Sequence, residues 1–173
     1  MAKLILMCGY PYSGKTVLAK EIAQHFGYER IDIDDVLLQH GYKSFDDPRI
    51  TPEELSQFFD ECYDNLRSFL KSGKSVIFDT SNPSFDRRQD LANMALQCKA
   101  SSMVIYLDLP KELILERWRN NIRSQERMQI TERTLEEAFL EMEKPSESEN
   151  VLFFDGSLKN AEWIEKYKDT LQD

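Results

Sequence analysis

The sequence has few of the residues that build metal clusters, disulfide frameworks or membrane spans. It holds two histidines and three cysteines, and Cys8, Cys62 and Cys98 lie far apart with no C-x-x-C pair. This spacing is typical of reduced thiols in a cytoplasmic protein. No apolar run is long enough to cross a bilayer, and the run from Leu4 to Cys8 is too short for a signal-peptide core. We therefore expect a cytoplasmic protein with no membrane partner.

Positive charge is also scarce, since the formal net charge is −9 over 173 residues. Binding a nucleic acid duplex over a large surface requires many Lys and Arg contacts to phosphate. We therefore expect no extended nucleic acid partner, although a small basic pocket is compatible with this balance. The length suffices for one hydrophobic core, so we predict a single domain over residues 1–173, acting as a monomer or weak dimer.

Short apolar runs alternate with longer segments of helical periodicity. Runs of this kind read as strands buried on both faces of a parallel sheet. The expected strands are Lys3 to Cys8, Arg30 to Ile33, Ser75 to Phe78, Met103 to Leu107 and Val151 to Phe154. Right-handed crossovers then place helices on both sides. The pattern predicts a three-layer, doubly wound α/β domain with a five-stranded parallel sheet.

The first of these runs leads into GYPYSGKT, which matches the phosphate-binding pattern G-x-x-x-x-G-K-[ST]. A strand before it and a helix after it are the context that the motif requires, and a chance turn is the alternative. We predict that Lys15 bridges the β and γ phosphates of ATP and that the Thr16 hydroxyl holds Mg²⁺. The full set of predicted nucleotide-binding residues here is Gly9, Tyr10, Pro11, Tyr12, Ser13, Gly14, Lys15, Thr16 and Val17.

Two acidic positions follow expected strands. In RIDIDD, alternation along a strand would place Asp32 and Asp34 on one face, with Asp34 nearer the end where ligands bind. Asp34 could then take the proton of an acceptor hydroxyl. The alternative is that Asp34 or Asp35 caps the following helix.

The second acidic position is Asp79, which ends the apolar run in SVIFDTSN. An Asp at this place orders Mg²⁺ in many phosphate-loop proteins, so we predict a metal or acceptor contact. A simple turn at Asp79 and Thr80 is the alternative. Asn82 and Arg88, which follow, are assigned to substrate binding.

An arginine-rich segment comes after the fourth strand. Arg119, Arg123 and Arg127 are spaced four apart, so one helix face and a loop could present all three, and Arg117 lies at the other edge. Arginines of this kind stabilise a transferring phosphoryl group from a segment that closes over the nucleotide. We predict a lid over about residues 118–133, with Arg123 and Arg127 catalytic and Arg117 binding the nucleotide. A solvated basic face is the alternative.

Taken together, the phosphate motif, the Asp pair, FDTSN followed by Arg87 and Arg88, and the lid resemble the P-loop kinases of the polynucleotide kinase-like and zeta toxin-like group. The resemblance implies ATP and Mg²⁺ as cofactors. It also implies that Asp34 activates the acceptor hydroxyl, that Asp79 assists acceptor binding, and that Arg123 or Arg127 acts on the ATP phosphates.

The chain departs from that group at two positions. The group has DDYR, and its arginine, which holds a phosphate of the nucleic acid, falls here on Leu37. Tyr12 stands where Gly is common, so we predict that its ring points out of the loop toward solvent, the lid or the acceptor cleft. These features favour an ATP-dependent kinase acting on a hydroxyl of a small-molecule or nucleotide-like acceptor. A 5′-hydroxyl polynucleotide kinase and a nucleotide-dependent switch are the alternatives.

Overall fold

The computed structural model describes residues 1–43, 47–124 and 129–172 and is built on one sheet. Its five strands are all parallel and lie in the order β2-β3-β1-β4-β5. Four of them confirm the expected runs within about two residues: β1 (Lys3–Cys8), β3 (Val76–Phe78), β4 (Ser101–Leu107) and β5 (Val151–Phe154). The predicted five-stranded parallel sheet is therefore confirmed.

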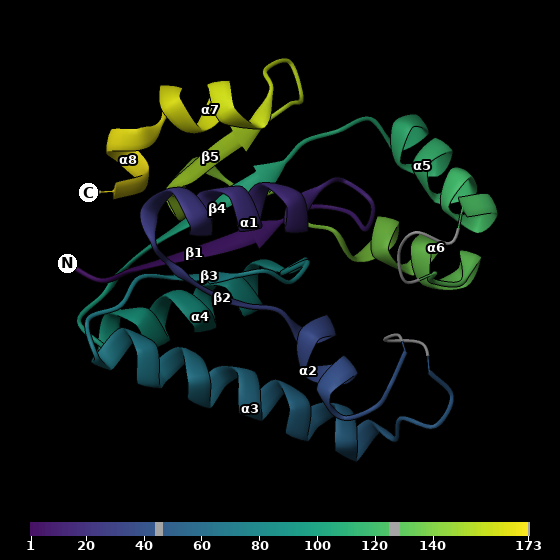
Figure 1. The fold of residues 1–173 in the computed structure, drawn as a ribbon, viewed down its shortest axis with the longest axis horizontal. Helices are drawn as coiled ribbons and strands as arrows, with labels where there is room; N and C mark the ends of the chain where they lie inside the picture. The colour runs from purple at the N-terminus through teal and green to yellow at the C-terminus, as the bar shows by residue number, and fades with distance from the viewer. Residues whose placement is uncertain (44–46, 125–128, 173) are drawn as a thin grey trace.

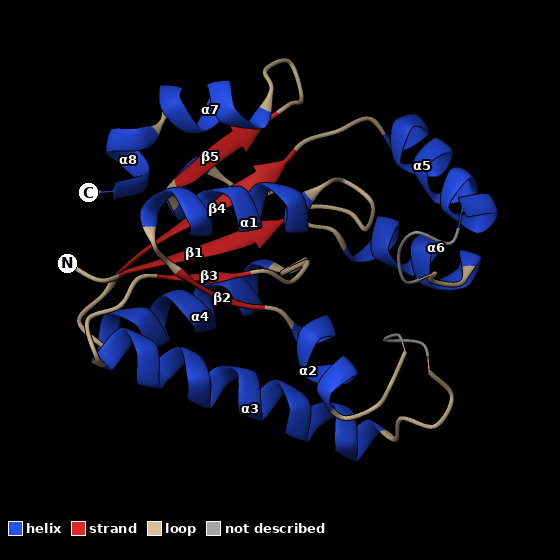
Figure 2. Ribbon diagram, in the orientation of Figure 1, coloured by secondary structure: helices blue, strands red, loops and turns tan. Residues whose placement is uncertain are grey.

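Helices cover both faces of this sheet, as Figures 1 and 2 show. On one face, α1 (Lys15–Phe26), α7 (Asn160–Lys166) and α8 (Lys168–Gln172) pack against Ile5, Met7 and Ile105. On the other face, α3 (Pro52–Lys71) and α4 (Phe85–Gln97) pack against alternate residues of the same strands. Two hydrophobic cores result, one on each side, because every residue of the central strand β1 is buried.

The region after β2 differs from the sequence-based expectation. The strand β2 covers only Glu29–Ile31, and Ile33–Gln39 forms the helix α2. Asp32 is the N-cap of that helix, where its side chain accepts a hydrogen bond from the Asp34 backbone N–H at 3.0 Å. The prediction that Asp32 and Asp34 share a strand face was therefore wrong, and so was the alternative that Asp34 or Asp35 provides the cap. Asp34 lies in the first turn of the helix.

Two further helices extend beyond the carboxyl ends of the strands (Figure 1). These are α5 (Lys111–Ser124) and α6 (Glu132–Glu141), which frame the predicted lid. Thr131 caps α6, because its side-chain oxygen accepts a hydrogen bond from the Thr134 backbone N–H at 3.1 Å. A 3₁₀ turn, η1 (Glu147–Glu149), then leads into β5. Within the described ranges, no helix is both long and apolar enough to span a bilayer.

A buried ion pair joins α4 to the turn before β5. The Arg88 guanidinium is 1% exposed, and its Nε and Nη2 donate to the two carboxylate oxygens of Glu149 at 2.6 and 3.2 Å. Its Nη1 donates to the carbonyl oxygens of Asn82 and Pro83. Burial alone would raise the pKa of Glu149, but the hydrogen bonds from Arg88 lower it. The assignment of Arg88 to substrate binding is corrected here, because its donors hold the fold together inside the protein.

Removing one member of this pair should therefore destabilise the protein strongly. Glu149→Ala leaves a buried cation without a partner, so we expect a loss of about 3 to 5 kcal/mol in the free energy of unfolding. Replacing both residues, with Arg88→Met and Glu149→Leu, should recover most of that loss. Urea denaturation of the single and double variants measures both values. Equal losses in Glu137→Ala, which breaks the exposed pair with Arg133, would contradict this role.

Candidate active site

The phosphate loop lies between β1 and α1 and adopts a conformation that needs its two glycines. Gly9 has φ 144°, and a Cβ there would lie 3.2 Å from the carbonyl oxygen of Leu107. Gly14 has φ 102° and precedes the first turn of α1. Lys15 is buried, and its ammonium donates to the carbonyl oxygens of Gly9 and Tyr10 at 3.0 and 2.7 Å. The lysine is thus folded back into the loop, where phosphate oxygens would compete for its protons.

Tyr10 and Tyr12 join this loop to the lid helices. Tyr12 keeps a left-handed backbone with φ 61°, and its hydroxyl oxygen accepts from the backbone N–H of Ile130 at 3.4 Å. The Tyr10 ring meets the Phe139 ring edge to face, with 4.9 Å between centroids. Both tyrosines belong to an apolar cluster with α5 and α6. The prediction that the Tyr12 ring points out of the loop is confirmed, and its direction is toward the lid.

A cluster of carboxylates faces the phosphate loop at the ends of β2 and β3. Asp32 and Asp79 are buried, Asp34 is half-buried and Asp35 is exposed. Arg30 lies among them, and its Nη1 donates to Asp32 at 2.6 Å and to Asp79 at 2.8 Å. Its Nη2 donates to Asp35. Of the four carboxylates, Asp34 is the one that Arg30 does not contact.

Burial and like charges raise the pKa values of two carboxylates in this cluster. Burial, followed by the charges of Asp32 and Asp79, raises the pKa of Asp34 to about 6, against the opposing charge of Lys15. Burial and Asp32 likewise raise the pKa of Asp79 to about 6, while Lys15 and Arg30 act to lower it. Burial in turn lowers the pKa of Lys15, and Asp79 opposes that effect most strongly. The phosphate-binding lysine and the candidate base therefore lie in one electrostatic unit, where both carboxylates are unusually basic.

The residues here fit a magnesium ion held mainly through phosphate oxygens. Asp79 Oδ1 is buried and has no hydrogen-bond partner among the described residues, so it is available to a metal ion or its bound water. Thr16 is half-buried in the first turn of α1, next to Lys15. Over the described ranges, no three His, Cys, Asp or Glu side chains group as a self-sufficient metal site. Such a combination suits Mg²⁺, which binds through one or two carboxylates together with substrate phosphates.

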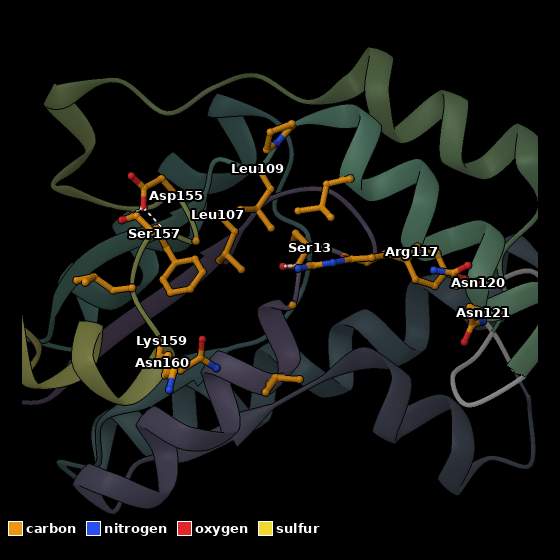
Figure 3. Close-up of a pocket in the computed structure, with 18 of the residues that line it drawn as sticks. Ser13, Leu107, Leu109, Arg117, Asn120, Asn121, Asp155, Ser157, Lys159 and Asn160 are labelled. Carbon is orange, nitrogen blue, oxygen red and sulfur yellow. Dashed lines mark hydrogen bonds between the residues drawn. The ribbon is translucent and has the colours of Figure 1, made fainter.

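A pocket of about 740 Å³ opens on the other side of the phosphate loop (Figure 3). It is lined by the loop, by α5 and by the segment that follows β5. Arg117 extends from α5 into it, and its Nη1 donates to the carbonyl oxygens of Tyr12 and Ser13, each at 3.0 Å. Asp155 and Ser157 close the far side, where the serine backbone N–H and hydroxyl both donate to Asp155 Oδ1. The pocket has room for a base and sugar beside the phosphate site.

The remaining predicted residues lie in different parts of the structure. Asn82 is 1% exposed, and its amide donates to carbonyl oxygens of Met7, Phe78 and Thr80, so its role is to tie strand ends together and its assignment to substrate binding is corrected. Arg123 is exposed near the end of α5. Arg127 lies outside the described residues. Pro11 is half-buried in the loop, and Val17 is exposed in the first turn of α1, where it lines the large pocket.

Sequence reasoning missed Arg30 and the far wall of the pocket. Arg30 is a single basic residue in a strand, and no local pattern marks it. Leu109, Leu113, Asn120 and Lys159 line the pocket from the turn before α5, from α5 itself and from the segment after β5. The acidic cluster around RIDIDD was the one signal that could have pointed to a neighbouring cation.

The sequence matches one known protein family over most of its length. Residues 4–145 match the model of the AAA domain family AAA_33. The chain belongs to that family. The matched range covers the phosphate loop, Arg30, the carboxylates and the lid.

Among curated proteins, this AAA domain is 29% identical over 115 residues to the L-seryl-tRNA(Sec) kinase of Methanococcus maripaludis, covering 66% of the chain and 44% of the relative. It is 30% identical over 108 residues to human Threonine synthase-like 1, covering 62% of the chain and 14% of that protein. The chain thus spans less than half the length of these curated relatives.

Solved structures share the fold at low identity. A gluconokinase from Sinorhizobium meliloti aligns over 98% of this AAA domain and 91% of its own chain, with a TM-score of 0.65 and 19% identity. The APS kinase of Mycobacterium tuberculosis aligns over 99% and 98%, with a TM-score of 0.71 and 13% identity. The fold expected from sequence, that of small P-loop kinases, is confirmed.

The raised pKa of Asp34 predicts a stability cost at neutral pH. The folded state holds the Asp34 proton more tightly than the unfolded state does, so ionisation destabilises the fold as the pH rises from about 4 to 6. Asp34→Asn should therefore be more stable than the wild type at pH 7, by at most about 3 kcal/mol. The gain should vanish at pH 4. Urea unfolding at both pH values measures it, with the exposed Asp60→Asn as control, and an equal gain at both pH values would contradict the assignment.

Tyr12 predicts a second measurable effect, on the lid. Tyr12→Gly relieves the left-handed backbone but removes the ring from the cluster with Ile130 and Phe139. We expect faster amide hydrogen exchange over residues 129–141, because the lid helices lose a packing partner. Nucleotide affinity should stay within about 3-fold, since the loop glycines and Lys15 are unchanged. Unchanged exchange in this range would show that the ring does not hold the lid.

Proposed function

We propose that the chain is an ATP-dependent kinase that transfers the γ-phosphoryl group to a hydroxyl of a small-molecule or nucleotide-like acceptor. The observation that carries this proposal is the position of Asp34. It is a basic carboxylate with no ion-pair partner among the described residues, and it lies in the same electrostatic unit as the phosphate-binding Lys15. A protein that only bound a nucleotide would have no need of such a base.

The proposed reaction assigns one proton to Asp34. The acceptor hydroxyl donates its proton to the Asp34 carboxylate as its oxygen bonds to the γ-phosphorus, while the bond from that phosphorus to the β-γ bridging oxygen breaks. ADP carries away the electron pair of the broken bond. A carboxyl group with a pKa of about 6 is ionised at neutral pH and still basic enough to accept this proton.

Other residues of the chain bind and stabilise the transferring group. In this proposal, Lys15 and the loop amides hold the phosphates. Arg117 of α5 donates to the carbonyl oxygen of Tyr12 in the loop, and the exposed Arg123 would act on the phosphates from the lid. Thr16 and Asp79 would hold Mg²⁺. When bound, this ion neutralises charge that develops on the phosphate oxygens. The pocket beside Arg117 would take the adenosine part of ATP.

The name of one curated relative supports a kinase function. The Methanococcus relative is named as a kinase, and its name places its acceptor on a seryl-tRNA. For this chain, the net charge of −9 and the buried Leu37 argue for an acceptor smaller than a nucleic acid. We propose that residues 1–173 work as one kinase domain with its lid at about residues 118–133.

A screen of ATP consumption across hydroxyl acceptors tests the function. The panel should include short oligonucleotides, nucleosides, sugars, sugar acids and antibiotics of the aminoglycoside and chloramphenicol types. We expect acceptor-dependent ADP release with at least one small acceptor, and a loss of at least about 1,000-fold in kcat with Asp34→Asn. Calorimetry should find the affinity of Asp34→Asn for a non-hydrolysable ATP analogue within about 3-fold of wild type.

Three outcomes would count against the proposal. Loss of nucleotide binding in Asp34→Asn would mean that Asp34 acts on the nucleotide rather than on the acceptor. Acceptor-independent hydrolysis as the sole activity would favour a nucleotide switch. Labelling of an oligonucleotide that weakens as salt rises would instead identify a polynucleotide kinase.

A further inference from the structure

Arg30 is the residue of this site that neither the motif nor the family match assigns. It lies in the middle of β2, and its side chain is 14% exposed. One nitrogen, Nη1, donates both to Asp32 Oδ2 at 2.6 Å and to Asp79 Oδ2 at 2.8 Å. Asp32 follows the end of β2 and Asp79 follows the end of β3. A single guanidinium nitrogen therefore connects two neighbouring strand ends.

This contact fixes Asp79 from two directions. The Asp79 backbone N–H donates to the Ile31 carbonyl oxygen at 2.8 Å, which continues the β2–β3 pairing by one step. Arg30 holds the Oδ2 atom of the same residue. The other carboxylate oxygen, Oδ1, is left buried and without a hydrogen-bond partner among the described residues. With one oxygen held and one unpaired, the Asp79 side chain has a defined orientation at the phosphate loop.

Charge explains why a cation is needed here. Asp32 is 7% exposed and Asp79 is 3% exposed, so both carboxylates are largely removed from water beside each other. Unpaired, two buried like charges would push apart or take up protons. The nearest other cation in this unit is Lys15, whose ammonium is held by loop carbonyls and is needed for phosphate. Arg30 is therefore the cation that allows both aspartates to stay in place.

The geometry also requires arginine rather than lysine. Nη1 reaches two carboxylates and Nη2 reaches a third, Asp35, so the contacts use two separate nitrogens of the planar guanidinium. A lysine ammonium carries its three donors on one atom and lacks this fork. The helix α2 that follows, Ile33–Gln39, contains no lysine or arginine. The cation that contacts these carboxylates therefore comes from the strand.

We propose that Arg30 is a positioning residue for phosphoryl transfer, which clamps Asp79 beside the phosphate loop and leaves Asp34 as the unclamped carboxylate that meets the acceptor. This inference rests on the proposed function. Arg30 acts through the aspartates and does not itself touch the reacting atoms. Its contribution should therefore appear in the rate of the chemical step rather than in the binding of ATP.

Substitutions of Arg30 test the clamp, with the exposed Arg67 of α3 as a matched control that pairs with Asp64. In Arg30→Gln we expect kcat with the acceptor from the screen to fall about 10- to 100-fold, while the KM for ATP stays within about 3-fold. Arg30→Lys keeps the charge without the fork and should recover part of this loss. Arg67→Gln should leave both constants unchanged.

Three results would overturn the proposal. The first is a kcat within about 3-fold of wild type in Arg30→Gln. The second is complete recovery in Arg30→Lys, which would make charge sufficient. The third is an equal effect on kcat and on ATP binding, which would indicate a general structural role. If Arg30→Gln does not fold, Arg30→Lys is used instead, and its effect on kcat is compared with its effect on the KM for ATP in the same way.

A crystal structure of Arg30→Lys separates this proposal from the proposed function. We expect the Asp79 carboxylate to turn away from Asp32 in that variant, whether or not any acceptor is phosphorylated. An unchanged Asp79 would overturn the clamp even in an active kinase. A wild-type protein that transfers phosphate to no acceptor would overturn the kinase assignment, while a displaced Asp79 would still support the positioning role.

Discussion

Repulsion among carboxylates at one edge of the sheet is the constraint on which this site depends. A parallel sheet brings the ends of β2 and β3 together, and both strands are followed by aspartates. Asp32 and Asp79 are too deeply buried for water to screen them, so they depend on nearby cations, of which Arg30 contacts both directly. The positions of the candidate base and of the metal-facing carboxylate both follow from that contact. The arrangement of the candidate catalytic residues thus follows from how the positive charge of Arg30 is shared among Asp32, Asp35 and Asp79.

Two arginine networks have different roles in this protein. Arg88 and Glu149 form a closed pair in which the side-on edge of the guanidinium is matched by both oxygens of one carboxylate. Arg30 instead serves three carboxylates and leaves the fourth, Asp34, unmatched. A closed pair gives rigidity and no chemistry, whereas an incompletely compensated cluster keeps a basic group at the surface of the cleft. The number of carboxylates around each arginine makes this difference.

Much of the fold was predictable because its signals are local. Apolar runs bounded by polar residues gave four strands, and the glycine-rich motif located the loop before α1. The helix α2 was missed because IDIDD alternates like a strand, while the capping role of Asp32 depends on a bend that alternation does not reveal. The roles of Arg88 and Arg30 depend on partners 61 and 49 residues away. Such pairings become visible only when strand order is known, which is why the assignments of Arg88 and Asn82 to substrate binding had to be corrected.

The bulky phosphate loop shows how a departure from the common pattern can be accommodated. Gly9 and Gly14 supply the positive φ angles that the loop cannot avoid, and Tyr12 adopts a third at φ 61° despite its side chain. A strained backbone of this kind persists only where its surroundings compensate for it. Here the compensation lies in the lid, because the Tyr12 ring packs with α5 and α6 while Arg117 binds the carbonyl oxygen of the same residue. The loop and the lid are therefore one mechanical unit, so any movement of the lid on nucleotide binding must change the contacts of the loop that holds the phosphates.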